Sequence, residues 1–435
     1  MNYQANRPLE QCPGYVAVVQ VVTPAGQRLA AALRRDALEL HTDRDIQYLF
    51  DLEGRFIRSG TRSEYRFRGC SHQGSISTKS ESGLVREWIS RSDLDRLCSE
   101  AWETASAFFQ AFQEKDNITR AHPSEEEGRD AIGSIMSRVM SWPPDRLAGE
   151  AERFRQVYQP IPVLPPDHYS SLVLQATEGC TFNTCTFCKL YQDVPYRVKS
   201  AEEFDRHIGA ALAFHGAGLY RLHNIFLGQA NALAAPLPRL MELFERLAHH
   251  IELPDPNLPV KASWTSGEPL RFQGIGSFLD GFTGLRKSAE DYDRLRLLGL
   301  RRVYLGVESG SDRLLAWLRK PAQTSDMIKT MERLHQAGIR NDIILLVGPG
   351  GTQWAREHVT QTLEFLAAAP LERGDRIYLS DIYAYPETPY PRAMDAIDSR
   401  PLSLEEMNEQ RDTLREGARE LGLQAIPYRV EPFIY

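Results

Sequence analysis

From about residue 171 the chain alternates short apolar runs with longer amphipathic stretches, and polar or glycine-rich turns separate them. The apolar runs predict buried strands and the amphipathic stretches predict helices. The runs are SLVLQAT (171–177), HNIFLG (223–228), VKASWT (260–265), RVYLGVE (302–308), DIILLVG (342–348) and RIYLSDIYAY (376–385). Repeated strand–helix units indicate a parallel α/β sheet, either open and doubly wound or a full or partial (β/α) barrel.

Three of the predicted helices carry a start signal. Ser200, Ser288 and Ser403 each stand three residues before an acidic residue. This spacing is typical of the capping box, in which the serine and the acid each accept a hydrogen bond from a backbone N–H of the first turn. In either fold the carboxyl ends of the strands are the expected place for chemistry.

The first 165 residues follow a different pattern. Short runs at 14–22, 37–42 and 51–69 predict a small antiparallel sheet. The stretch 90–112 is apolar on one face and predicts a helix capped by Ser92. These features indicate an N-terminal α+β domain.

Two segments suggest boundaries. The polar stretch 113–130 predicts a loop, and four prolines between residues 160 and 166 precede the first strand of the repeating pattern. We therefore expect an N-terminal domain over 1–165, the α/β domain over 166–400, and a C-terminal helix and tail over 401–435.

Composition narrows the class of protein. The 435 residues are 42% hydrophobic and 25% charged, which is typical of a globular chain with a substantial core. No apolar run approaches the ~20 residues that span a membrane, and residues 1–15 lack the pattern of a secretory signal, so we expect no membrane association and a cytoplasmic location. A net charge of -7 makes nucleic acid an unlikely partner.

Half of the six cysteines lie in one short segment. Cys180, Cys185 and Cys188 have the spacing C-x4-C-x2-C directly after the first predicted strand, whereas Cys12, Cys70 and Cys98 are scattered. In a reducing compartment such a cluster indicates metal binding or redox chemistry rather than disulfides. Three thiolates leave one coordination position open, which favours an iron–sulfur cluster over zinc.

A zinc site remains the alternative, and it needs a fourth ligand such as His207 or His223. Neither histidine has the local spacing of a zinc finger. The scattered cysteines predict no second cluster, which weakens reactions that use an auxiliary one.

The segment GCTFNTCTFCKLY resembles the cysteine loop of the radical S-adenosylmethionine (SAM) enzymes. Most of that superfamily has C-x3-C-x2-C. The longer spacing is similar to a branch near the oxygen-independent coproporphyrinogen oxidases and the Elongator-type radical enzymes, whose loop has the form G-C-x-x-N-x-C-x-F-C-x-x-Y. The resemblance covers about residues 171–390 and implies a partial (β/α)6 barrel like an incomplete TIM barrel.

The resemblance also implies cofactor contacts. Cys180, Cys185 and Cys188 correspond to the ligands of a [4Fe-4S] cluster, and Phe187 to an aromatic residue beside the adenine of SAM. Gly228, Gln229, Ala230 and Asn231 take the place of the turn that receives the methionine amino group. Glu308 and Ser309 match the Gly-x-Glu-Ser-Gly segment near the ribose or methionine end, and Gly348 and Tyr385 match the adenine side.

One segment is a competing match. Gly267 and Glu268 spell the family's literal Gly-Glu-Pro turn, but they follow the third predicted strand rather than the second. Because the second strand lies beside the first, we expect residues 228–231 to meet the methionine end. No catalytic side chain is assigned.

The resemblance implies an enzyme that cleaves SAM reductively to a 5′-deoxyadenosyl radical, which takes a hydrogen atom from a substrate. It also implies a flavodoxin- or ferredoxin-type electron donor. The substrate is expected to be a small molecule. The alternatives are an iron–sulfur or zinc scaffold or sensor, and an RNA-modifying radical enzyme. We expect the N-terminal domain to cover the open side of the barrel, with Arg58, Arg62, Arg66 and Arg68 available to an anionic substrate.

Overall fold

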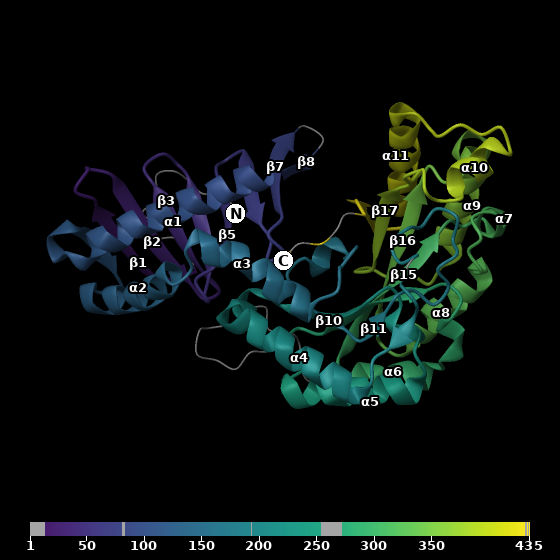
Figure 1. The fold of residues 1–435 in the computed structure, drawn as a ribbon. Coiled ribbons are helices and arrows are strands. Elements are labelled where there is room, and N and C mark those ends of the chain that lie inside the picture. The colour runs from purple at the N-terminus through teal and green to yellow at the C-terminus, as the bar shows by residue number, and fades with distance from the viewer. Residues whose placement is uncertain (1–13, 81–82, 193, 254–271, 431–432, 434) are drawn as a thin grey trace.

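The computed structural model describes residues 14–80, 83–192, 194–253, 272–430, 433 and 435. Figure 1 shows two groups of elements side by side, an antiparallel sheet from the N-terminal part of the chain on the left and a parallel sheet with its helices on the right. The C-terminal end of the chain lies between them. Both expected parts of the fold are therefore present.

The N-terminal sheet is larger than the sequence predicts. Its nine strands run in the order β8-β7-β6-β5-β4-β3-β2-β1-β9. They are β1 (Tyr15–Val22), β2 (Arg28–Arg34), β3 (Ala37–Thr42), β4 (Gln47–Asp51), β5 (Phe56–Gly60), β6 (Glu64–Arg68), β7 (Gly74–Ser80), β8 (Gly83–Ile89) and β9 (Ile118–His122). Helices α1 (Arg91–Gln113) and α2 (Glu125–Met140) supply buried residues to the same apolar core.

Two predictions in this region are wrong. The cap of α1 is Ser90, whose hydroxyl accepts a hydrogen bond from the N–H of Asp93, and Ser92 is not the cap. The predicted loop 113–130 contains β9, which pairs with β1, and the start of α2. Ser124 caps α2 by accepting from the N–H of Glu127, so a capping signal was present within the polar stretch.

The second sheet is entirely parallel. Its order is β10-β13-β14-β15-β16-β17-β18. The strands are β10 (Ser171–Gln175), β13 (Asn224–Gly228), β14 (Ile275–Asp280), β15 (Leu300–Glu308), β16 (Arg340–Val347), β17 (Arg376–Asp381) and β18 (Gln424–Tyr428). Because β10 and β18 are its two edges, the sheet is open, and the predicted partial barrel is confirmed with seven strands in place of six.

Five of the six predicted strands lie where the sequence places them. The predicted third strand, 260–265, falls outside the described residues, and β14 holds the third position in the sheet. The seventh strand, β18, comes from the stretch that the sequence assigned to a C-terminal tail.

Helices cover the outer face of the parallel sheet in an arc (Figure 1). They are α4 (Ala201–His215), α5 (Leu237–His250), α6 (Ala289–Leu297), α7 (Asp312–Trp317), α8 (Thr324–Gln336), α9 (Ala355–Ala368), α10 (Tyr390–Asp395) and α11 (Leu404–Glu420). The capping boxes predicted at Ser200, Ser288 and Ser403 are all formed. None of the helices that the structure describes is long and apolar enough to cross a membrane.

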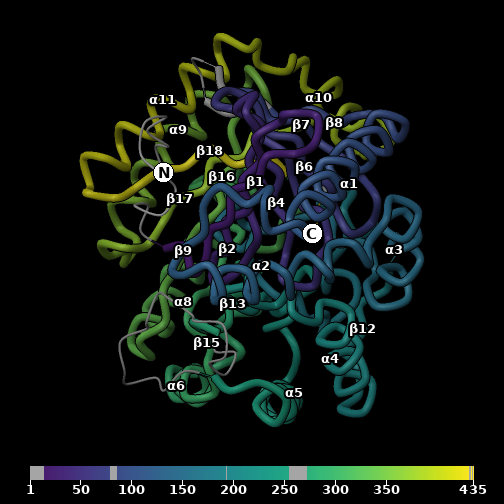
Figure 2. Tube along the Cα trace, turned by 90° about the vertical axis from the view of Figure 1, so that its left-hand side faces the viewer, coloured from purple at the N-terminus to yellow at the C-terminus, as the bar shows by residue number. Residues whose placement is uncertain are grey.

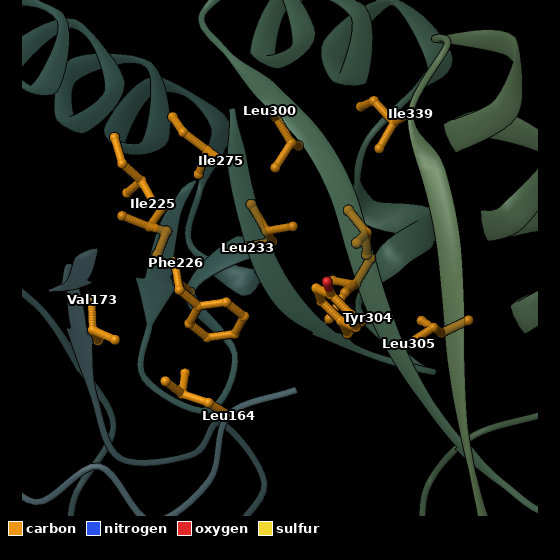
Figure 3. Close-up of a cluster of buried hydrophobic side chains, with 14 of the residues drawn as sticks. Leu164, Val173, Ile225, Phe226, Leu233, Ile275, Leu300, Tyr304, Leu305 and Ile339 are labelled. Carbon is orange, nitrogen blue, oxygen red and sulfur yellow. The ribbon is translucent and has the colours of Figure 1, made fainter. Parts of the chain in front are cut away.

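The inner face of the parallel sheet is filled by the segment that leads into it. Leu164 is buried, and Figure 3 shows it beside Phe226 and Val173 on the side of the strands away from the helices. The next turn, η3 (Pro166–His168), brings Asp167 under the sheet, where Tyr304 and Tyr378 donate hydrogen bonds of 2.6 and 2.9 Å to its carboxylate. The amino-terminal half of the barrel interior is thus occupied by the protein itself.

The two parts of the molecule are joined by a buried arginine. The guanidinium of Arg55 pairs with Asp51 at 2.8 Å and with Glu150 of α3 (Pro144–Val157) at 2.9 Å. It also donates to the carbonyl oxygens of Phe214 and His215 at the end of α4. Figure 2 shows the N-terminal sheet in front of the parallel sheet when the molecule is viewed from the left of Figure 1.

Candidate active site

The cysteine loop follows β10 and is closed at its base. Strands β11 (Thr177–Glu178) and β12 (Arg197–Val198) pair with each other and hold the two ends of the loop together. Arg197 adds ion pairs of 2.7 Å to both Glu178 and Glu203. The loop therefore starts and ends at the carboxyl end of the first strand, where the sequence places it.

The three thiols share one environment. Cys180, Cys185 and Cys188 are half-buried and unoxidised. The pKa of Cys185 is raised to about 12, chiefly by burial and also by the nearby Cys188, Glu308 and Cys180, while Lys320 lowers it. Burial also raises the pKa of Cys188, with Cys180 adding to the shift. Metal binding at these thiols must therefore displace protons, as is usual for cysteine ligands.

The loop conformation depends on a residue with positive φ. Asn183 has φ +55, and its side-chain amide donates a hydrogen bond to the carbonyl oxygen of Tyr191. Asparagine tolerates the left-handed region better than most residues because its short side chain can bond locally. Asn183 and Tyr191 occupy the asparagine and tyrosine positions of the loop motif, and this hydrogen bond joins them.

The far side of the loop rests on α7 and α10. The N–H of Thr186 donates to the carbonyl oxygen of Leu318 at 3.0 Å, and the N–H of Tyr390 donates to the carbonyl oxygen of Thr186 at 3.1 Å. Thr186 lies between Cys185 and Cys188, so the backbone of the cysteine segment is fixed from both helices.

The histidines considered as zinc ligands have other positions. The Nε2 of His207 accepts a hydrogen bond of 2.9 Å from the N–H of Gln175. His223 precedes β13, at the opposite end of the sheet from the cysteines. Within the described residues no three His, Cys, Asp or Glu side chains form a group that could share a single metal ion.

The turn after β13 contacts the cysteine loop, as strand order predicts. The side-chain oxygen of Gln229 accepts from the N–H of Gly179 at 3.2 Å, and its side-chain amide donates to the carbonyl oxygen of Pro160 at 3.1 Å. Asn231 donates to the hydroxyl of Thr181 at 3.1 Å and also to the carboxylate of Asp280. These side chains are engaged in holding the loop.

The backbone of the same turn is less occupied. The carbonyl oxygens of Gln229 and Ala230 accept no hydrogen bond from the parts of the chain that the structure describes. A Cβ placed on Gly228 would approach no atom closer than 3.9 Å, so the local packing does not require glycine there. The competing residues Gly267 and Glu268 lie outside the described residues.

Glu308 ends β15 in an unusual conformation. It has φ +65, and the register with β16 shifts between Gly306 and Glu308. Its carboxylate accepts a hydrogen bond of 2.6 Å from Lys320, with the two side chains only 13% and 8% exposed. Bulges and left-handed residues are enriched at functional sites, where they redirect a side chain.

Lys320 was not predicted from the sequence. Burial by itself lowers its pKa, but Glu308, Cys185 and Asp280 outweigh that effect and raise it above the usual value. A Cβ on Gly306 would come within 3.0 Å of Glu308 Oε1 and 3.1 Å of Lys320 Nζ, so this glycine makes room for the ion pair. The pair forms a buried charged centre next to the cysteines.

Ser309, expected beside the cofactor, has a structural partner. Its buried hydroxyl donates a hydrogen bond of 2.8 Å to Nδ1 of His358. The Nε2 of His358 donates a hydrogen bond of 3.0 Å to the carbonyl oxygen of Leu346. Burial lowers the pKa of His358 to about 4, so the ring is neutral. The arrangement ties the end of β15 to α9.

Phe187 and Gly348, which the resemblance assigns to the adenine side, both have neighbours within the protein. Phe187 packs against a small apolar cluster that includes Leu314, Tyr390 and Met394. Gly348 has φ +79, and a Cβ there would collide with Met407 of α11. Met407 is therefore the side chain that leaves no room for a Cβ at Gly348.

Tyr385 lies beside Lys189, the residue that follows the last cysteine. The ammonium of Lys189 sits 3.8 Å from its ring centroid and pairs with Glu387 at 2.7 Å. Tyr383, which is 63% exposed, packs against the same ring.

The arginines of the predicted N-terminal hairpin do not gather. Arg68 is buried against Glu150, Arg66 pairs with Glu64, Arg62 approaches Asp45, and Arg58 lies over Tyr65. Arg58 pairs in register with Phe67, so it lies on the opposite face of the sheet from Arg66 and Arg68. The expected cluster of four arginines is not formed.

A comparison with protein families identifies the central part of the chain. Residues 174–366 match the model described as the radical SAM superfamily. This part of the chain belongs to the radical SAM superfamily. The match includes the cysteine loop and the strand ends that carry Gly228, Glu308 and Gly348. Members of the superfamily are enzymes, so the chain is identified as an enzyme whose reaction class is open.

Solved structures similar in outline are radical SAM proteins. Coproporphyrinogen III oxidase from Escherichia coli is 16% identical, with a TM-score of 0.39, covering 58% of this chain and 52% of that one. The methyltransferase TsrM from Kitasatospora setae is 17% identical, with a TM-score of 0.36, covering 54% and 42%. Elp3 from Methanocaldococcus infernus is 13% identical, with a TM-score of 0.37, covering 56% and 54%.

The chain spans about half the length of these structures, and at these scores the likeness assigns no function. No curated protein matches the chain in sequence.

Proposed function

We propose that the chain is a cytoplasmic radical SAM enzyme that holds a [4Fe-4S] cluster with Cys180, Cys185 and Cys188 and acts on a small molecule. When bound, the cluster supplies the electron for reductive cleavage of SAM, which yields methionine and a 5′-deoxyadenosyl radical able to abstract hydrogen. The observation that carries the proposal is the buried Glu308–Lys320 pair beside the cysteine loop.

The cysteines fit a cubane. Each cysteine of such a cluster binds a different iron, so the thiols must surround a volume and need not converge on one point. The three thiols here influence one another electrostatically, yet they form no group suited to a single ion among the residues described. The fourth iron would be left for a ligand other than cysteine.

The charges around the loop fit the methionine end of SAM, which carries an ammonium and a carboxylate. Lys320 is a buried cation that can attract the carboxylate. Glu308 and the open carbonyl oxygens of Gln229 and Ala230 can accept from the ammonium. The proposal therefore keeps the expected contact between residues 228–231 and the methionine end of SAM. The backbone of these residues makes the contact in place of their side chains.

The rest of the protein limits access to this centre. A cavity on the inner face, lined by Leu164, Tyr191, Phe226 and Gly228, has a volume of about 10 Å³. That is about the space of one water molecule. A substrate must therefore approach from the carboxyl ends of the strands, and the interior beneath excludes water from the reacting groups.

The test is anaerobic reconstitution of the full chain. We expect about four irons per chain and slow release of 5′-deoxyadenosine from SAM with dithionite. Alanine at Cys180, Cys185 or Cys188 should remove the iron. Cys98→Ala is the control, because Cys98 is buried in the N-terminal core. Stoichiometric zinc without iron, or a loaded protein that does not bind SAM, would support the scaffold alternative.

A further inference from the structure

A pocket of about 620 Å³ opens on the outer side of the cysteine loop. Thr186 of the loop lines it together with Trp317 and Arg319, which end and follow α7. The opposite wall comes from the turn after β17 and from α10, and includes Glu387 and Arg392. The pocket is separate from the small cavity on the inner face of the sheet.

The pocket is cationic. Arg319 and Arg392 are exposed, and neither has an ion pair with any residue that the structure describes. The carboxylate of Glu387 is already neutralised by Lys189 at 2.7 Å. Two guanidinium groups are thus left without a counter-charge in a chain whose net charge is -7. Such a site attracts acidic partners and increases their rate of encounter.

The residues around the pocket are those that dominate binding at protein interfaces. Arg319, Arg392 and Trp317 lie in it, and the exposed Tyr383 packs at a tilt against Tyr385 beside Lys189. Arginine, tryptophan and tyrosine are the residue types enriched among interface hot spots. This composition favours a protein partner over a small free anion.

The position of the pocket connects it to the proposed cluster site. Thr186 lines the pocket and is adjacent in sequence to Cys185, while its backbone bonds to Leu318 and Tyr390 fix it in place. Figure 1 shows α7 and α10 at the end of the molecule away from the N-terminal sheet. A second protein can therefore reach the pocket without displacing any part of the N-terminal region.

We propose that this pocket is the docking site of an acidic electron-carrier protein of the flavodoxin type. The proposal rests on the function proposed above. In the docked complex one electron passes from the reduced carrier, which is oxidised, to the cluster held by the three cysteines, which is reduced. No covalent bond forms in this step. Arg319 and Arg392 bind the acidic surface around the carrier's flavin, and Trp317 lines the same pocket.

The test uses the reconstituted full chain and a purified bacterial flavodoxin. Binding of the oxidised flavodoxin is measured by calorimetry at low and at physiological salt, and SAM cleavage is measured with reduced flavodoxin and separately with dithionite. The variant is Arg319→Glu with Arg392→Glu. The matched control is Arg294→Glu with Arg415→Glu, which changes the charge equally at exposed positions on α6 and α11.

We expect the pocket variant to bind flavodoxin at least about tenfold more weakly than the wild type and the control, with the difference shrinking as salt rises. Its flavodoxin-driven cleavage should fall in parallel, while its dithionite-driven cleavage stays at the wild-type rate. Equal affinities for the pocket and control variants, or no binding by the wild type, would overturn the docking site.

The two proposals fail differently. A wild-type protein that does not cleave SAM with dithionite contradicts the proposed function, and the binding measurement still decides the docking site. A protein that cleaves SAM with dithionite, but whose flavodoxin binding ignores Arg319 and Arg392, contradicts the docking site alone.

Discussion

Lys320 donates a hydrogen bond of 2.6 Å to Glu308, and both side chains are withdrawn from solvent next to the cysteine loop. The two residues come from the end of a strand and from the turn after the following helix. Glu308 has a positive φ, and a Cβ on Gly306 would come within 3.0 Å of Glu308 Oε1 and 3.1 Å of Lys320 Nζ. Because buried ion pairs contribute little net stability, we propose that this pair serves ligand binding.

We expect Lys320→Met to lower the free energy of unfolding by about 3–5 kcal/mol, because it leaves the carboxylate of Glu308 buried and unpaired. The double variant with Glu308→Gln should recover much of that loss, since no uncompensated charge remains. Urea unfolding of the metal-free chain measures both. We also expect the double variant to lose its affinity for SAM. An unchanged affinity would show that the pair does not belong to the SAM-binding site.

Glycines 228 and 306 should respond differently to alanine. At Gly306 a Cβ meets the ion pair at 3.0 and 3.1 Å, so Gly306→Ala should destabilise the fold by about 1–3 kcal/mol. At Gly228 the nearest atoms are 3.9 Å away, so Gly228→Ala should change stability by less than about 0.5 kcal/mol. Thermal unfolding of the two variants gives the comparison. If Gly228→Ala also leaves SAM binding intact, the methionine end does not pass over that residue.

Asn183 provides a test of loop preorganisation. Asn183→Gly keeps the positive φ accessible but removes the hydrogen bond to Tyr191, whereas Asn183→Ala loses both and should strain the loop by about 1–2 kcal/mol. We expect iron content after reconstitution to fall in the order wild type, Gly, Ala. Full iron loading of the alanine variant would show that the loop is ordered by the metal alone.

Four buried histidines predict acid sensitivity. Burial lowers the pKa of His168 and His358 to about 4, and that of His207 and His215 to about 3. Below about pH 6.5 the unfolded chain binds protons at these rings and the folded chain does not. The free energy of unfolding should therefore fall as pH drops from about 6.5 towards 4, by up to about 1.4 kcal/mol per pH unit for each histidine.

Denaturation with urea at several pH values checks this slope. His358→Gln should reduce it by the contribution of one ring, while the exposed His249→Gln should leave it unchanged. A slope that is the same in both variants and the wild type would mean that His358 is not held neutral in the folded protein.

The strands that the sequence revealed are those with continuous apolar runs, because both faces of a parallel sheet are covered. The two that it missed lack this pattern. β14 contains Gly276, where any side chain would collide with His168, and Ser277, whose hydroxyl bonds to Leu227 across the sheet. β18 contains Pro427. An edge strand tolerates proline because its outer side has no neighbouring strand that needs an N–H donor. Both exceptions depend on neighbours remote in sequence.

The same distinction holds at the candidate site. The cysteines and Glu308 were found because their motif is local. Lys320 was not, since a single lysine 12 residues after Glu308 has no pattern of its own until the chain turns it inward. The ligand contact assigned to Gly348 stays a prediction, and the structure adds a neighbour, Met407, from a helix whose packing the sequence does not specify.

The turn that carries Asp167 has a consequence for how the chain is made. This turn is synthesised before every strand of the parallel sheet, yet its carboxylate is held by Tyr304, Arg376 and Tyr378, which come much later. During translation, the segment that fills the barrel therefore leaves the ribosome before the strands that form its wall and hold Asp167. Until residues 376–378 emerge, Asp167 lacks most of its partners, so the nascent sheet assembles around a segment already in place. The last strand, β18, adds the hydrogen bond from the hydroxyl of Tyr428 to the carbonyl oxygen of Leu164, so this segment gains its final partner only when the wall is complete.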